Sequence, residues 1–77
     1  MRRMGEKEIM AVISQKRDLA FEFDSHVVAQ RDEYIYLHID GRDVKIGKYK
    51  SQERANQVFI EMIEMNVLEV TYYMPEV

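Results

Sequence analysis

The sequence predicts a single α+β domain in two layers: a mostly antiparallel β-meander of four to five strands, one amphipathic helix at about residues 51–66, and one C-terminal strand. Three observations predict this fold class. Apolar and polar residues alternate in short segments between residues 10 and 50, an apolar stripe with helical spacing follows, and alternation returns after residue 66. A sheet and a helix that each present one apolar face bury those faces against each other.

The first three strands are predicted between residues 10 and 30. Residues 10–13 are apolar at every position, which is typical of a buried, central strand. In the next strand, Leu19, Phe21 and Phe23 share one face, and polar residues take most of the other. Residues 26–30 are expected to form a third, short strand.

The clearest feature is a β-hairpin formed by residues 34–39 and the residues that follow Asp40-Gly41. Glycine accepts the positive φ angle that tight hairpin turns require, so Asp-Gly between two alternating runs is a strong hairpin signal. A two-residue loop would pair Leu37 with Val44. A four-residue loop would pair Leu37 with Ile46. Both registers keep the apolar residues on one face, whereas a three-residue loop would require a bulge.

A helix is expected to begin after Ser51, whose hydroxyl is suited to cap it, and to end at Asn66. Its apolar residues recur at helical spacing and form one stripe, which we expect to dock on the sheet. The stripe consists of Ala55, Val58, Phe59, Met62 and Ile63.

A last strand is predicted from Leu68 to Tyr73, ended by Pro75, which cannot donate to a ladder. Such a long apolar strand at a sheet edge invites pairing, either within the chain or across a two-fold axis. A homodimer is therefore an expectation.

The composition fits one small domain. The chain has 77 residues, 47% of them hydrophobic, a net charge of −3 and no cysteine. Residues 1–9 carry charges of both signs and are expected to be a flexible extension, and residues 10–77 to be the domain. We expect a cytoplasmic protein without a signal peptide or a membrane span. A negative net charge gives no general attraction to nucleic acid, so any such binding requires a local patch.

Catalysis and cofactor binding are not predicted. The chain contains two histidines, His26 and His38, and their spacing does not indicate a metal site. His38 could face Asp43 across the hairpin, but an exposed polar pair is the simpler interpretation. No phosphate-binding loop is recognisable, because neither hairpin glycine opens a helix.

A candidate binding surface lies on the hairpin face opposite its apolar residues, where aromatic and basic residues are interleaved. It consists of Tyr34, Tyr36, His38, Lys45, Lys48 and Tyr49. In the four-residue register Tyr34 would lie opposite Tyr49, and Tyr36 opposite Gly47. Such a surface suits a protein interface, and it could also stack bases and neutralise phosphates.

Three segments resemble small proteins of phages and prophages of Gram-positive bacteria: residues 10–15, residues 47–55 and residues 73–76. Those proteins have no assigned activity. The resemblance implies a phage or mobile-element context and no catalytic residues. Together with the surface above, it predicts a non-catalytic interaction module that binds a protein partner or itself. The alternative is a nucleic-acid or nucleotide binder that uses hairpin 34–50.

Overall fold

The computed structural model describes residues 10–66, 68 and 70–77, and in them it confirms the α+β class. The expected extension of residues 1–9 lies outside the described residues. The elements are β1 (Ala11–Ile13), β2 (Ala20–Glu22), the 3-10 helix η1 (Phe23–Ser25), β3 (Val27–Arg31), β4 (Tyr34–Ile39), β5 (Arg42–Lys48), α1 (Gln52–Asn66) and β6 (Tyr72–Tyr73). None of the described helical segments is long and apolar enough to cross a membrane.

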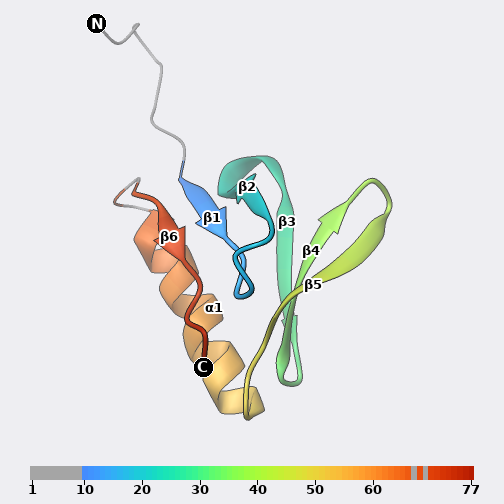
Figure 1. Cartoon of the computed structure of the whole chain (residues 1–77), viewed down its shortest axis with the longest axis vertical. Helices are drawn as coiled ribbons and strands as arrows, with labels where there is room; N and C mark the ends of the chain where they lie inside the picture. Colours follow the sequence, from blue (N-terminus) through green and yellow to red (C-terminus); the bar gives the residue numbers. More distant parts are fainter. Residues whose placement is uncertain (1–9, 67, 69) are drawn as a thin grey trace, which may run out of the picture.

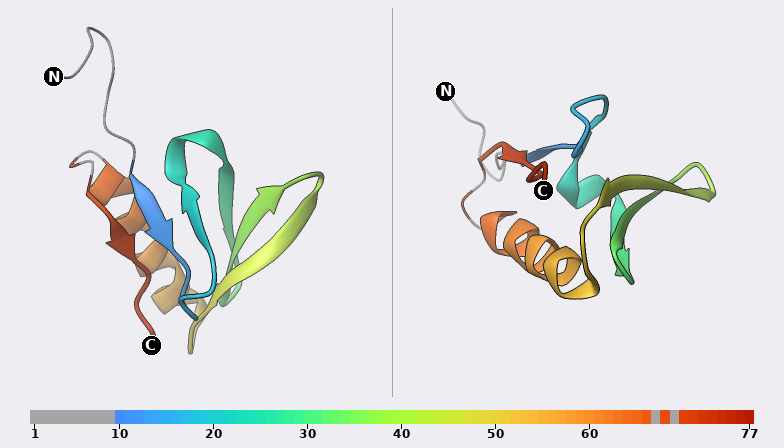
Figure 2. Two further views of the ribbon diagram at one scale, coloured as in Figure 1. Left: turned by 45° about the horizontal axis from the view of Figure 1, so that its top comes forward. Right: turned by 60° about the horizontal axis from the view of Figure 1, so that its bottom comes forward.

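The strands form two sheets of three strands each, with the orders β2-β1-β6 and β3-β4-β5. Strand β1 is central, as its continuous apolar character predicted. All neighbours are antiparallel except β1 and β6, which are parallel. Figures 1 and 2 show α1 lying along one face of the β1–β6 pair, with the β3–β5 hairpins as a separate layer beside it.

The core lies between α1 and the two sheets. Its buried apolar side chains are Met10, Val12, Phe21, Ile35, Leu37, Ile46, Tyr49, Ala55, Val58, Met62, Tyr72 and Met74. Every regular element except η1 and β3 contributes at least one of them. The domain therefore depends on a single core, as its length predicted.

Helix α1 begins as the sequence predicted. The Ser51 hydroxyl accepts a hydrogen bond from the Arg54 N–H at 3.1 Å, which satisfies one of the free donors of the first turn. Ala55, Val58 and Met62 are buried, and Phe59 is half-buried against the core. The predicted stripe was wrong at Ile63, which is 44% exposed because the docked face of α1 is narrower than the stripe.

The C-terminal strand is shorter than predicted. Only Tyr72–Tyr73 pairs, and it pairs in parallel with Val12 and Ile13 of β1. Strand β1 has three residues, so it offers a short template. Leu68 and Val70 are exposed, and residue 69 of the predicted strand lies outside the described part of the chain.

The side chain of Gln15 joins the two sheets. Its side-chain amide accepts a hydrogen bond from the Lys48 N–H at 2.7 Å and donates one to the Lys48 carbonyl at 2.8 Å. The main-chain N–H of Gln15 donates to the Ile46 carbonyl at 3.0 Å. These bonds replace a strand along that part of the β5 edge. The side-chain nitrogen of Gln15 also donates to the Glu76 carbonyl at 3.0 Å.

Replacing Gln15 with Glu is expected to lower the free energy of unfolding by about 1–3 kcal/mol. The carboxylate keeps the acceptor for the Lys48 N–H but loses the donor for two carbonyls. The matched control is Gln52→Glu in the exposed first turn of α1, where a negative charge is favourable. Urea unfolding of both variants measures the difference, and equal stabilities would show that the Gln15 bridge contributes nothing.

Candidate functional site

The register of the β4–β5 hairpin decides which side chains reach its outer face. Asp40 and Gly41 both have positive φ angles, 53° and 78°, as a two-residue hairpin turn of type I′ requires. Leu37 lies opposite Val44, so the two-residue register is confirmed near the turn. The four-residue register is wrong.

A β-bulge changes the register beyond this point. Tyr36 lies opposite Lys45, but Ile35 lies opposite Gly47 and not opposite Ile46. Ile46 and Gly47, although consecutive, are therefore both buried. A Cβ atom at residue 47 would lie 2.7 Å from Cε of Met74 and 3.0 Å from Cε2 of Tyr49, so these two buried side chains would have to shift. Glycine allows this bulge.

The bulge puts Lys48 on the outer face and Tyr49 in the core. With strict alternation, Lys45 and Lys48 would lie on opposite faces; with one inserted residue they share a face, opposite Tyr36 and Tyr34 respectively. Tyr49 is 3% exposed and donates a hydrogen bond from its hydroxyl to the Pro75 carbonyl at 2.8 Å. The expectation that Tyr49 belongs to the binding surface is wrong.

The outer face carries cations over aromatic rings. The rings of Tyr34 and Tyr36 lie 6.1 Å apart, centroid to centroid. The Lys45 ammonium and the Arg31 guanidinium each lie 4.4 Å from a ring centroid, of Tyr34 and Tyr36 respectively, and the Lys48 ammonium lies 6.0 Å from that of Tyr34. We call these five residues the basic face.

His38 and Asp43 lie opposite each other beside the basic face, as the exposed polar pair that the sequence favoured. His38 Nδ1 is 2.9 Å from one Asp43 oxygen, and Arg31 Nη2 is 3.1 Å from the other. The hydrogen bond from His38 is the largest cause that lowers the pKa of the Asp43 carboxyl; desolvation opposes it, and the hydrogen bond and charge of Arg31 lower the pKa further. Arg31 is therefore oriented by an ion pair while its guanidinium covers the Tyr36 ring.

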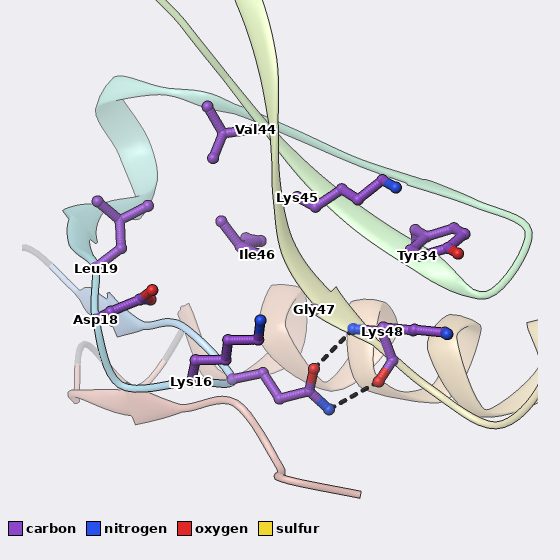
Figure 3. A pocket seen from close by; sticks show the side chains of 10 residues that line it. Lys16, Asp18, Leu19, Tyr34, Val44, Lys45, Ile46, Gly47 and Lys48 are labelled. Carbon is purple, nitrogen blue, oxygen red and sulfur yellow. Dashed lines mark hydrogen bonds between the residues drawn. The ribbon is translucent and has the colours of Figure 1, made fainter.

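A pocket of about 530 Å³ adjoins the basic face, between β5 and the turn that follows β1 (Figure 3). Its lining includes the apolar residues Leu19, Val44 and Ile46, and also Lys45, Lys48 and Tyr34, whose side chains lie near one another in Figure 3. Gln15, Lys16, Asp18 and Gly47 complete the lining. The hydrogen bonds between Gln15 and Lys48, dashed in Figure 3, hold the turn against β5.

Sequence reasoning missed three contributors to this region: Lys16, Arg31 and Gln15. Arg31 lies opposite Tyr34 at the end of the β3–β4 hairpin, so a register prediction for that hairpin would have placed it on the same face as the tyrosines. Gln15 meets β5 through tertiary contacts and Lys16 lines the same pocket, and the local sequence contains no signal for either.

The second histidine lies elsewhere. His26 Nδ1 is 3.0 Å from the Glu22 carbonyl oxygen, and its ring packs edge-on against Phe21 at 5.9 Å. Among residues 10–66, 68 and 70–77, no group of three or more histidine or carboxylate side chains is arranged to hold a metal ion.

No protein-family model, curated protein or solved structure matches the chain. The basic face and its pocket are therefore the grounds on which a function can be assigned.

Proposed function

We propose that the protein is a non-catalytic binding module whose basic face binds single-stranded nucleic acid. The observation that carries this proposal is the pairing of each tyrosine of the face with a cation at 4.4 Å. Single-strand binders combine aromatic rings, on which bases stack, with cations that neutralise the backbone. Here both kinds of group alternate on one open sheet surface.

The geometry of the face suits a short stretch of single strand. Tyr34 and Tyr36 are two residues apart on β4, so their rings project from the same side, and both are only half-buried. The cations over the rings come from the two flanking strands, Arg31 from β3 and Lys45 from β5. Two bases can therefore stack at this face, on the parts of the rings that the cations do not cover, while the phosphates follow the cations.

The charge of the whole chain limits this binding to the face. With a net charge of −3, the protein as a whole repels a polyanion. Each phosphate contact contributes about 1 to the slope of log affinity against log salt, and the basic face offers only three cations for such contacts. Binding by the basic face therefore has a small salt slope, unlike binding by an extended basic surface.

The test is fluorescence anisotropy with a labelled single-stranded oligonucleotide at low and moderate salt. The double variant Lys45→Glu/Lys48→Glu is expected to abolish binding, and Tyr36→Ala to weaken it about tenfold with an unchanged salt slope, since one stacked base is lost. Lys50→Glu, an exposed lysine outside the face, is the control for charge. Binding that survives the double variant, or falls equally with Lys50→Glu, would overturn the proposal.

A specific observation also favours self-association. Strand β3 is a sheet edge of five residues, and Val27, at its start, is 64% exposed. An antiparallel edge can pair with the same edge of a second copy about a two-fold axis. The other edge strands are less suited to such a dimer, because β2 and β6 have three and two residues, and β5 is hydrogen-bonded to Gln15 at Ile46 and Lys48.

Light scattering at micromolar concentration tests this second candidate. A dimer mass that Val27→Lys converts to a monomer mass, and that the control Val70→Lys leaves unchanged, would support the β3 edge. A monomer mass for the unmodified chain would exclude the dimer. The phage or mobile-element context stays a prediction from the sequence resemblance.

A further inference from the structure

We infer that the pocket beside the basic face recognises a terminal phosphate monoester, so that the protein prefers a phosphorylated end of a single strand to its interior. This inference rests on the proposed function, because Tyr34, Lys45 and Lys48 belong both to the basic face and to the pocket lining. A strand that follows the face therefore runs into the pocket.

The charge of the lining matches a dianion. The lining contains three lysines, Lys16, Lys45 and Lys48, and one carboxylate, Asp18, which gives a formal charge of +2 (three positive charges minus one). A phosphate monoester carries about −1.5 to −2 at pH 7, whereas a phosphodiester within a strand carries one negative charge. The monoester is thus the better complement to this pocket.

The turn that carries Lys16 is held in place before any ligand binds. Ser14, which is buried, donates its hydroxyl hydrogen to the Asp18 carboxylate at 2.8 Å and accepts from the Leu19 N–H at 3.2 Å. Arg17 adopts a positive φ of 64°, and its N–H donates to the Ser14 carbonyl at 2.9 Å. Because Asp18 is engaged with Ser14, the lysines are freer to meet an anion.

The apolar part of the lining gives the pocket a place for the terminal nucleoside. Leu19 and Val44 are half-buried and Ile46 is buried; Figure 3 shows Leu19 on the turn and Val44 and Ile46 on β5, the strand that also carries Lys45 and Lys48. Ligand pockets combine such apolar walls with a few polar groups, and the volume of about 530 Å³ is within their usual range. The ligand class is therefore a nucleotide with a free phosphate, at the end of a strand or alone.

The experiment compares one labelled oligonucleotide with a 5′-phosphate, with a 3′-phosphate and with hydroxyl groups at both ends. At least one phosphorylated form is expected to bind about tenfold tighter than the hydroxyl form, the gain from one charge-assisted contact. Calorimetric titrations with a nucleoside monophosphate and with inorganic phosphate separate the contribution of the apolar wall, and only the nucleotide is expected to bind.

Lys16→Gln separates this inference from the proposed function. Lys16 lines the pocket but is not part of the basic face, and it is exposed in a turn. The variant is expected to reduce the preference for the phosphorylated end to less than about twofold while binding of the hydroxyl form is unchanged, and the control Lys50→Gln should keep the full preference.

The outcomes are distinct. Equal binding of all three oligonucleotides overturns the inference and leaves the proposed function standing. A preference that survives Lys16→Gln also overturns it. The absence of binding by every form overturns the proposed function and this inference together.

Discussion

Replacing Met62 with alanine is expected to lower the free energy of unfolding by about 2–5 kcal/mol, the range for truncating a buried methionine. Met62 is fully buried on the docked face of α1, in the single core that joins the helix to both sheets. Small domains have a total stability of about 5–15 kcal/mol, so the loss is a large fraction of it. Urea unfolding followed by circular dichroism measures the change.

The neighbouring residue supplies the matched control. Ile63 belongs to the same predicted stripe and the same helical turn but is 44% exposed. Ile63→Ala is expected to change the free energy of unfolding by less than about 0.5 kcal/mol, because it is a surface substitution to a better helix former. Equal losses from the two substitutions would show that α1 docks through a face centred between them, contrary to the structure.

The elements that the sequence predicts correctly are those with local causes. The hairpin turn follows from Asp40 and Gly41, which take the two positive φ angles that only a few residue types accept. The start of α1 follows from Ser51, whose hydroxyl accepts a hydrogen bond from the N–H of Arg54, three residues later. Each signal and its structural result lie within a few residues of each other.

The division into two sheets has a non-local cause. Residue 15 is 31 residues from Ile46 and 33 from Lys48, yet Gln15 takes the place that a strand would occupy beside β5. Nothing in the residues around Gln15 distinguishes it from any other turn glutamine. Alternation alone therefore predicted one continuous meander.

A single β-bulge explains why alternation of apolar and polar residues predicted the members of the candidate surface only in part. Tyr34, Tyr36, Lys45 and Lys48 do form one face, and His38 lies beside it. Tyr49 belongs to the core because the inserted residue reverses the alternation from Gly47 onward. Gly47 packs against the Met74 side chain. This is a tertiary contact, so the residues around Gly47 do not indicate why a glycine is present there.

The segment after β6 is fixed by contacts that are equally non-local. Each main-chain oxygen of residues 74–77 accepts a hydrogen bond from a distant side chain. The donors are, in order along the segment, Arg17, Tyr49, Gln15 and Arg54. These bonds make Tyr49 a structural residue, with consequences for the pH dependence of stability.

Alkaline pH is expected to unfold the protein through Tyr49 and Tyr72. Burial raises the pKa of Tyr49 to about 12. Burial, and next the hydrogen bond that its hydroxyl donates to Glu61 at 2.6 Å, raises the pKa of Tyr72 further. In the unfolded chain both pKa values are about 10. The stabilisation is thus complete below pH 10 and is lost as the pH rises through the folded-state values.

Between pH 10 and 12 the unfolded chain binds fewer protons than the folded protein, so the free energy of unfolding should fall by about 1.4 kcal/mol per pH unit for each of the two tyrosines. Tyr49→Phe and Tyr72→Phe should each remove about half of their joint contribution to this slope. Tyr73→Phe is the control, since Tyr73 follows Tyr72 in β6 but is 61% exposed. Urea unfolding at several pH values above 9 gives the slopes, and comparing variants cancels the titration of the lysines. If Tyr73→Phe changed the slope as much as Tyr72→Phe, the alternation of buried and exposed side chains along β6 would be wrong, and with it the placement of Tyr72 against α1.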